Sequence, residues 1–266
     1  YENTIIFFFS DHGGPFPRYK RSIYDTGIKC PLIIKWIDKN EIKRNNQMIS
    51  FIDFAPTILD IVGLKANNLM EGVSFYNKEE RQNIFAATDR FDESITKRRC
   101  IRNKNFKLII NYDTTHPTYK PIKYRSQMGT MKILDSLNRT NSNNTFFKTW
   151  YKPPKSKYEL YNVTDDPYEQ KNIYLDSNYK LTFELLKNKL IEWINSSDYG
   201  NLSEKDMLSK MWPNGNPPTL NQPEVKNVSD GKIITSNNDG ASIGWRNQEE
   251  NSWKIYLNDE IIYPND

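Results

Sequence analysis

Short apolar runs rich in β-branched and aromatic residues recur along the first part of the chain. They occupy residues 4–10 (TIIFFFS), 31–36 (PLIIKW), 84–88, 106–112 and 158–163. Runs of this length that are bounded by turn residues predict β-strands. Residues 4–10 are apolar at successive positions, which predicts a strand buried on both faces, as in a parallel sheet covered by helices.

Two stretches have the spacing of helices. Residues 51–64 place apolar side chains at helical intervals, with Pro56 in the first turn of the predicted helix and Gly63 at its C-terminal cap. Residues 180–194 (KLTFELLKNKLIEWI) carry leucines, Trp193 and Ile194 along one side and predict an amphipathic helix.

The remaining segments are polar or rich in turn residues. The basic stretch 97–104 (KRRCIRNK) is predicted to connect two strands, and residues 113–157 predict long loops with one short helix. Proline and glycine crowd residues 212–224, which predicts a linker, and the apolar runs after it predict a small β unit.

Composition narrows the class of protein. The chain has 266 residues, of which 37% are hydrophobic and 26% charged, with a formal net charge of +4. This balance is typical of a folded globular protein, and the positive excess is too small to indicate a nucleic-acid partner. No apolar run reaches the roughly 20 residues that a membrane span needs. Cys30 and Cys100 are read as buried thiols, since they form neither a disulfide framework nor a CxxC metal site.

The stretch after residues 4–10 carries the candidate chemistry. Asp11 and His12 follow the strand directly, and Lys20 lies in a long loop that also contains Arg18 and Arg21. A carboxylate and an imidazole side by side can bind one cation, and a lysine can hold an anion against it. Taken alone, an ordinary Asp/His turn with solvated lysines explains the same residues.

Four stretches in order resemble one family. FFFSDHGG, followed by KRSIYDTGIKCPLIIKW from Lys20, resembles the type I, formylglycine-dependent sulfatases of the alkaline-phosphatase superfamily. SFIDFAPTILDIVGL, MEGVSFYN and YELYNVTDDPYEQKNI resemble later motifs of the same family, so that the resemblance covers residues 3–198. The GGPFPRYKR loop is most similar to the sulfamidase-like, glycan-acting branch.

The resemblance implies a fold and a division into domains. It implies the C-terminal part of an alkaline-phosphatase-like α/β fold, with a mixed sheet flanked by helices, a small C-terminal sulfatase subdomain and a short β tail. The domains expected are 1–112 for the α/β core, 113–212 for a loop-rich subdomain ending in a helix, 213–224 for a linker and 225–266 for a partial β accessory module.

The resemblance also implies site residues. Asp11 and His12 match two of the family's four calcium ligands, and Lys20 matches the lysine that contacts sulfate. Arg18 is a candidate substrate contact beside Lys20. Arg90 and Asp92 lie where relatives place groups that face the substrate, although plain loop polarity is the favoured explanation of both residues.

The family's nucleophile is not found in this chain. The family oxidises the Cys or Ser of a C/S-x-P-S-R motif to formylglycine and supplies two aspartates for the same calcium ion. Cys30 and Cys100 stand in other contexts. We therefore expect the motif in a missing N-terminal half upstream of Tyr1, with this chain a fragment of a longer protein. A chain cleaved after folding and a decayed, non-catalytic relative are the alternatives.

The expected function is that of a sulfatase acting on sulfate esters or N-sulfates of a glycan, inactive as this chain alone. The family implies a secreted or periplasmic location. Two alternatives stay open at this point. One is a metal-dependent phosphodiesterase or phosphonate hydrolase of the same superfamily, and the other is a non-catalytic glycan-binding remnant.

Overall fold

The computed structural model describes most of the chain in two compact units. The first unit spans residues 1–201 and the second spans 202–266, and each is described by itself. The residues described are 2–263 except 38–43, 77–79, 118, 120, 142, 145–146, 148–149, 152–155, 197–201, 213–215, 217–218, 239–240, 251 and 257–260.

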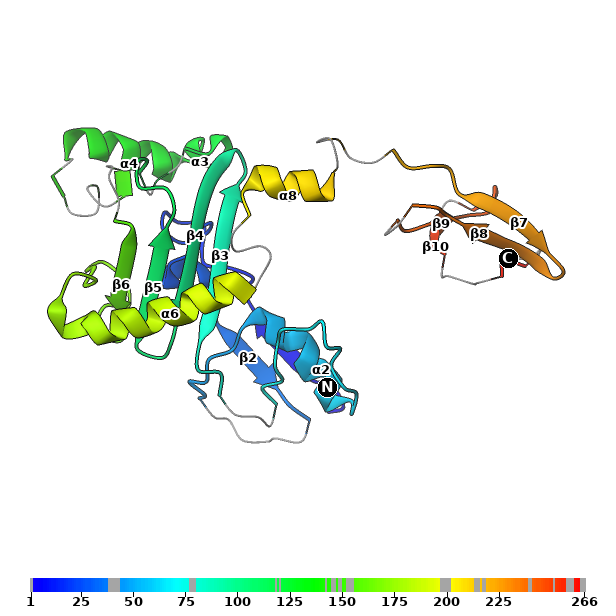
Figure 1. Cartoon of the computed structure of the whole chain (residues 1–266), viewed down its shortest axis with the longest axis horizontal. Helices are drawn as coiled ribbons and strands as arrows, with labels where there is room; N and C mark the ends of the chain where they lie inside the picture. The colour runs from blue at the N-terminus through cyan, green and yellow to red at the C-terminus, as the bar shows by residue number, and fades with distance from the viewer. Residues whose placement is uncertain are drawn as a thin grey trace. The chain divides into compact units, whose positions relative to one another are not determined.

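A four-stranded antiparallel sheet is the centre of the first unit. Its strand order is β3-β4-β5-β6, so each strand pairs with its neighbour in the sequence. The bounds are Ile84–Phe91 for β3, Ser94–Arg102 for β4, Phe106–Asn111 for β5 and Tyr158–Asn162 for β6. Helix α6, Lys180–Ser196, lies across one face of this sheet (Figure 1).

The two faces of the sheet differ in chemistry because side chains alternate along each strand. Ile101, Leu108 and Leu160 lie on the face toward α6 and form a buried core with Leu186 and Leu190 of that helix. The opposite face is buried too, but it carries charged residues such as Arg98, Lys107 and Glu159. That polar face packs against the N-terminal segment of the chain, and this contact positions the candidate site.

The first residues form a separate two-stranded layer. Strand β1, Ile6–Phe9, pairs antiparallel with β2, Leu32–Lys35. Short helix α1, Asp25–Ile28, lies between them in sequence. Phe7 and Phe9 pack their rings against Phe54, at the start of α2.

The expectation for residues 4–10 is wrong in two respects. The strand pairs antiparallel, and only its Phe7 and Phe9 face is packed. On the other face Phe8 and its partner Ile33 are 69% and 65% exposed. No helix of the described residues covers that face, so a strand with the composition of a buried one presents apolar side chains to solvent.

The predicted helix at 51–64 is confirmed with a 3₁₀ start. Helix η1 covers Phe51–Asp53 and α2 covers Phe54–Ile61. Gly63 follows with a φ of 74°, the left-handed conformation that ends many helices and that glycine adopts without strain. Asp53 caps this region, since its carboxylate accepts hydrogen bonds from the backbone N–H groups of Ser50 and Val73.

Two other predictions need correction. The basic stretch 97–104 is not a connection, because residues up to Arg102 form most of β4, where the arginines are neutralised by acidic partners. Residues 113–157 contain more helix than predicted, namely α3 at Lys123–Ser126 and α4 at Gly129–Thr140. The helix at 180–194 is confirmed as α6, which follows the 3₁₀ turn η2 at Ser177–Tyr179.

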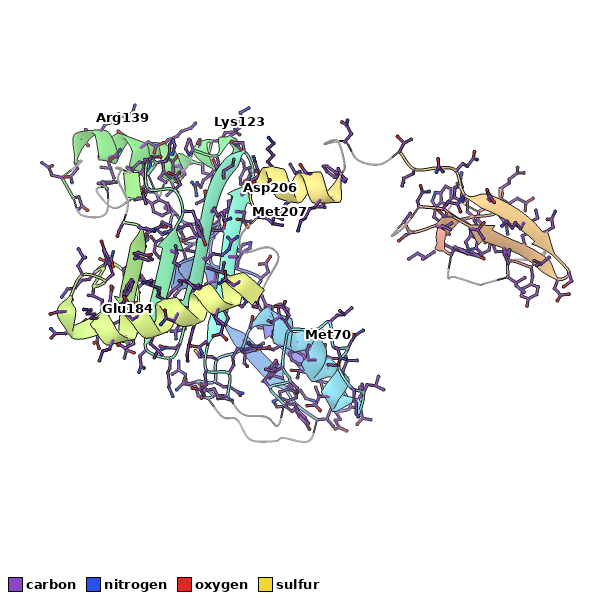
Figure 2. The ribbon with its side chains drawn as sticks, viewed as in Figure 1. Met70, Lys123, Arg139, Glu184, Asp206 and Met207 are labelled. Atoms are coloured by element: carbon purple, nitrogen blue, oxygen red, sulfur yellow. The ribbon has the colours of Figure 1, made fainter. Side chains whose placement is uncertain are left out.

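The second unit is a helix followed by small antiparallel sheets. Helix α8, Glu204–Met211, begins at a Ser203 and Asp206 capping box, and Asp206 and Met207 are labelled in Figure 2. The strands pair as β7 with β8 and β9 with β10. They span Glu224–Val228, Gly231–Thr235, Gly244–Trp245 and Lys254–Ile255.

The α/β fold with a helix-flanked sheet is confirmed, whereas the predicted domain boundaries at 112, 212 and 224 stay predictions. Part of the predicted linker, and residues 264–266 of the tail, lie outside the described residues. Strand β6 joins β3–β5 in one sheet. In the part of the chain that the structure describes, no helix is long and apolar enough to span a membrane.

The core between sheet and α6 gives a direct test of the fold. Leu190 is 0% exposed, whereas Leu181 on the same helix is 86% exposed. Leu190→Ala should lower the free energy of unfolding by about 2–5 kcal/mol, through lost apolar burial and the cavity left behind. Leu181→Ala should change it by less than about 0.5 kcal/mol. Urea denaturation measures both, and equal effects would contradict the packing described.

Candidate functional site

The site is built on a loop between β1 and β2, residues 10–28, here called the motif loop. Two of its glycines allow the chain to cross itself. The Gly13 N–H donates to the Gly27 carbonyl at 2.9 Å. A Cβ on Gly13 would lie 1.9 Å from the Thr26 carbonyl oxygen, and one on Gly27 would lie 2.3 Å from that of Ser22. Glycine is therefore required at both positions, and the crossing brings the two ends of the loop together.

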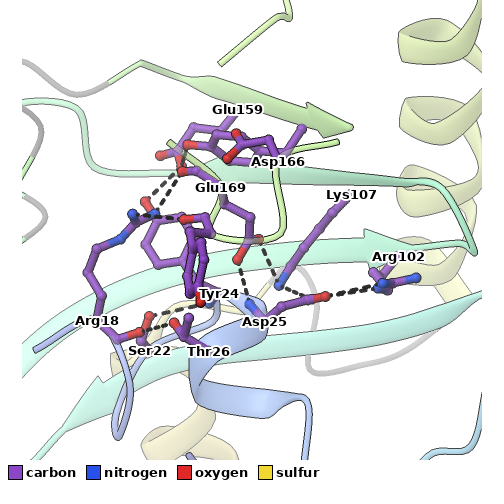
Figure 3. Close-up of polar contacts among 12 residues, drawn as sticks. Arg18, Ser22, Tyr24, Asp25, Thr26, Arg102, Lys107, Glu159, Asp166 and Glu169 are labelled. Atoms are coloured by element: carbon purple, nitrogen blue, oxygen red, sulfur yellow. Dashed lines mark hydrogen bonds and ion pairs between the residues drawn. The ribbon is translucent and has the colours of Figure 1, made fainter. Parts of the chain in front are cut away.

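A buried ion cluster, here called the lysine clamp, joins the motif loop to the sheet (Figure 3). Lys107 of β5 lies 3.0 Å from the Asp25 carboxylate and 3.1 Å from that of Glu169. Glu169 also accepts a hydrogen bond of 2.6 Å from the Asp25 backbone N–H, and Arg102 of β4 donates to Asp25 at 3.2 Å. The clamp thus ties the loop, two strands and the segment after β6 at one point.

The protonation of the clamp follows from burial and pairing. Burial acts to raise the pKa of Asp25, but Lys107 and Arg102 outweigh it and hold that pKa below its ordinary value. Burial raises the pKa of Glu169 despite Lys107. Burial acts to lower the pKa of Lys107, yet Glu169 and Asp25 hold it above its ordinary value. The ammonium is therefore charged at neutral pH, with Asp25 as its ionised partner.

A second buried cluster surrounds Glu159 of β6. Its carboxylate accepts hydrogen bonds from Tyr24 and Tyr161 at 2.8 Å each, and from Arg98 at 3.0 Å. Asn111 donates to it at 2.6 Å. Burial acts to raise the pKa of Glu159, but Arg98 and these donors hold it low. Tyr24 is part of the motif loop, so this cluster is a second fastening beside the lysine clamp.

Arg18, predicted to contact substrate, is engaged with the protein. Its guanidinium donates to the carbonyl oxygens of Tyr168 and Glu169 at 3.1 and 2.9 Å and lies 4.0 Å above the Tyr24 ring. Its backbone has a φ of 63°. These contacts place Arg18 on the inner side of the loop, and its predicted role toward substrate stays a prediction.

Asp11 and His12 lie together at the start of the loop. His12 Nε2 is 3.6 Å from the Asp11 carboxylate, and His12 Nδ1 lies 2.7 Å from the Gly13 carbonyl oxygen. The Asp11 side chain is 82% exposed. One carboxylate and one imidazole this close fit two positions of a cation site, while calcium takes six to eight ligands. Among the described residues, no group of three or more His, Cys, Asp or Glu side chains could hold a metal.

Lys20 lies in the turn on the far side of the same loop. Its backbone N–H donates to the Gly14 carbonyl at 3.0 Å, which fixes the position of the residue. Its ammonium has no ion pair or hydrogen bond to the residues that the structure describes, whereas Arg18 and Arg21 on either side are engaged. A fixed backbone that carries a half-buried cation is suited to hold an anion.

Asp92 also comes to the motif loop, although it is far away in the sequence. It lies in the β3–β4 turn, and its carboxylate pairs with Arg21 at 2.9 Å. Arg90 is an exposed residue of β3. The structure thus brings Asp92 to the residue next to Lys20, and the substrate roles predicted for Arg90 and Asp92 stay predictions.

Comparisons with known proteins find similarity to sulfatases. The family described as "N-sulphoglucosamine sulphohydrolase, C-terminal" matches residues 16–141. An "Ulvan-active sulfatase" of Formosa agariphila is 39% identical over 267 residues, covering 96% of this chain and 45% of that protein. The chain belongs to the sulfatase family. The human N-sulphoglucosamine sulphohydrolase is 27% identical over 72% of the chain and 41% of its own length.

Solved structures show the same fold. A 2-O GAG sulfatase matches 76% of the chain with a TM-score of 0.54 at 19% identity, over 39% of its own length. A protein solved with its substrate D-glucosamine-2-N,6-O-disulfate matches 77% of the chain with a TM-score of 0.51 at 22% identity, over 36% of its length. This sulfatase-family chain spans less than half the length of the relatives and structures named here.

The residues that fasten the motif loop were missed by the sequence analysis. Lys107 is a lone charge in an apolar strand, and Glu169 lies in a polar turn. Each looks ordinary in its own segment. A lysine flanked by apolar residues in FKLII of β5 is the signal that indicates a buried acidic partner.

The lysine clamp predicts a pH-dependent loss of stability. Lys107→Met leaves the buried Glu169 carboxylate without its cation and leaves Asp25 with Arg102 alone, which should cost about 3–5 kcal/mol at pH 7. Their pKa values then rise, so both groups take up protons and the loss should shrink as the pH falls from about 7 to about 4. Urea denaturation of the wild type and the variant between about pH 7 and about pH 4 measures this loss of stability.

The exposed neighbour Lys104 provides the control for that experiment. Lys104→Met removes the same charge from an exposed position and should change the free energy of unfolding little at either pH. A Lys107→Met loss that is small, or equal at both pH values, would contradict the clamp.

Proposed function

We propose that this chain is part of a sulfatase that removes sulfate, as an ester or an N-sulfate, from a sulfated glycan. The observation that carries the proposal is the Lys20 ammonium, carried by the same clamped loop as Asp11 and His12. The sulfatase relatives support the reaction class, and the ulvan-active and glucosamine-sulfate names among them support a carbohydrate substrate.

In this proposal Lys20 contacts a non-bridging oxygen of the sulfate group. Charge builds on those oxygens as the S–O or S–N bond breaks, and a fixed cation stabilises it with no reorganisation at that moment. The backbone hydrogen bond of Lys20 and the lysine clamp keep the backbone of this residue in place. An exposed lysine on a loose loop would spend part of that energy on ordering.

Asp11 and His12 would hold a calcium ion, whose charge, when bound, would polarise the sulfate oxygens and favour an ionised oxygen nucleophile. The two residues supply part of a coordination shell, and the other ligands would come from the rest of the full-length protein. We place the formylglycine nucleophile there as well.

The exposed face of β1 and β2 supports the proposal that another part of the full-length protein packs against this chain. Phe8 and Ile33 lie opposite each other and are largely exposed, which is unusual for adjacent apolar strand residues. An N-terminal half of the same protein would bury them and complete the site. A polymeric glycan is met outside the cell, so we also propose a secreted or periplasmic location.

Replacement of Lys20 tests the proposal. In the full-length protein, Lys20→Gln should lower kcat/KM for 4-methylumbelliferyl sulfate and for a sulfated polysaccharide by about 10²- to 10³-fold, as expected for loss of one charge-stabilising donor. The exposed Lys29, in the same segment, provides the matched control. Lys29→Gln should leave both rates unchanged.

The same assay separates the alternatives. A wild-type preference for 4-methylumbelliferyl phosphate over the sulfate would favour a phosphodiesterase or phosphonate hydrolase. Binding of sulfated polysaccharide without sulfate release by the full-length protein would favour a non-catalytic glycan-binding protein. Equal activity of Lys20→Gln and wild type would contradict the role of Lys20.

A further inference from the structure

A small pocket, here called the arginine pocket, lies where the motif loop meets the sheet. Its volume is about 30 Å³, and its lining comes from the motif loop, the β3–β4 hairpin and the region of α3. Arg21 contributes from the motif loop, directly after Lys20. One residue of the lining is therefore the sequence neighbour of Lys20, the proposed sulfate contact.

The charged side chains that line the arginine pocket are positive. Among the residues that the structure describes, the arginine pocket is lined by Arg21, Arg98 and Arg125 and by no acidic residue. Asp92 and Glu159 pair with the first two arginines from outside the lining. Arg125 lies 5.1 Å from the Tyr119 ring, and burial lowers its pKa. A poorly hydrated guanidinium favours contact with an oxyanion, and arginine binds such groups through two parallel hydrogen bonds.

Hydroxyl groups line the same face of the sheet. Ser94 and Thr96 alternate with outward residues along β4 and so share a face with Arg98, while Thr88 of β3 pairs directly with Arg98. Thr88 is only 9% exposed, and within the described residues its hydroxyl has no hydrogen-bond partner. A buried hydroxyl without a hydrogen-bond partner lowers the stability of the fold by about 1–3 kcal/mol. The Thr88 hydroxyl can therefore donate a hydrogen bond to a group that fills the pocket.

We propose that the arginine pocket binds a carboxylate on the sugar that carries the scissile sulfate, or on its neighbour, and so selects acidic glycans. The volume exceeds the ~10–15 Å³ that a cavity needs to hold one water molecule, so a small group such as a carboxylate can enter it. Guanidinium and hydroxyl donors are the groups that bind carboxylate oxygens. This inference rests on the proposed sulfatase function.

The test compares two sulfated disaccharides that differ in one group. One carries a uronic acid and the other carries the same sugar with its carboxylate reduced to a primary alcohol. In the full-length protein, the wild type should have about tenfold lower KM for the acidic disaccharide, a difference expected of one charged hydrogen-bonding group. Thr88→Val keeps the shape of the side chain and removes the hydroxyl, so it should raise the KM for the acidic disaccharide only.

Arg125→Gln should raise the same KM by tenfold or more, again with little change for the reduced disaccharide. Lys123, exposed at the start of α3 and labelled in Figure 2, is the matched control outside the pocket lining. Lys123→Gln should change neither KM. Melting temperatures of all three variants show whether a change reflects folding instead of recognition.

Equal KM values of the wild type for the two disaccharides would contradict carboxylate binding in the arginine pocket. An equal change of both KM values in Thr88→Val and Arg125→Gln would contradict it too. Activity on 4-methylumbelliferyl sulfate, which has no carboxylate, decides the sulfatase function separately. Where no sulfate is released, calorimetric binding of the same two disaccharides still decides the pocket. Equal affinities would exclude it, and a tenfold preference for the acid that Thr88→Val abolishes would support it.

Discussion

The buried ammonium of Lys107 is the constraint on which the candidate site depends. It faces carboxylates from two segments, Asp25 at 3.0 Å and Glu169 at 3.1 Å. A charge this deeply buried is tolerated only when paired. Removing either the loop or the segment after β6 would leave it partly uncompensated. The chain therefore cannot form the polar face of its sheet without also fixing the loop that carries Lys20.

This arrangement explains why the sheet has two unlike faces. An apolar face against α6 provides ordinary hydrophobic stability, through residues such as Leu108 and Leu190. The polar face adds little net stability for its cost, because burying paired charges gains little over apolar packing. Its directional contacts do specify where Tyr24 and Asp25 lie. Precise placement of a loop is what a site for a charged ligand requires.

Sequence patterns predicted the parts of this fold that are governed by local rules. Helix α6 follows from the spacing of its leucines, and the end of α2 follows from Gly63, whose φ is positive. Strand β4 was missed because its density of arginines is typical of an exposed segment. Its burial depends on Glu159 and Asp25, which lie about 60 and 75 residues away in the chain. Pairing at such range cannot be read from local periodicity.

The sequence predicted some residues of the candidate site and missed others. Asp11, His12 and Lys20 were found because they form a contiguous motif after a strand, and the structure places them on one loop. The pairing of Asp92 with Arg21 and the lysine clamp were not predicted, since each joins segments through folding alone. The exposed face of β1 was predicted as buried, because its composition is that of a buried strand and composition alone does not show which residues cover it.

Hydrogen–deuterium exchange across residues 13–28 tests the central claim most directly. If buried ion pairs fix the motif loop, the amides of Gly13, Lys20 and Gly27 should exchange with protection close to that of β5, and Lys107→Met should remove the loop's protection first. Rapid exchange of the loop in the wild type, beside a well-protected β5, would contradict the claim that the clamp holds Lys20 in place.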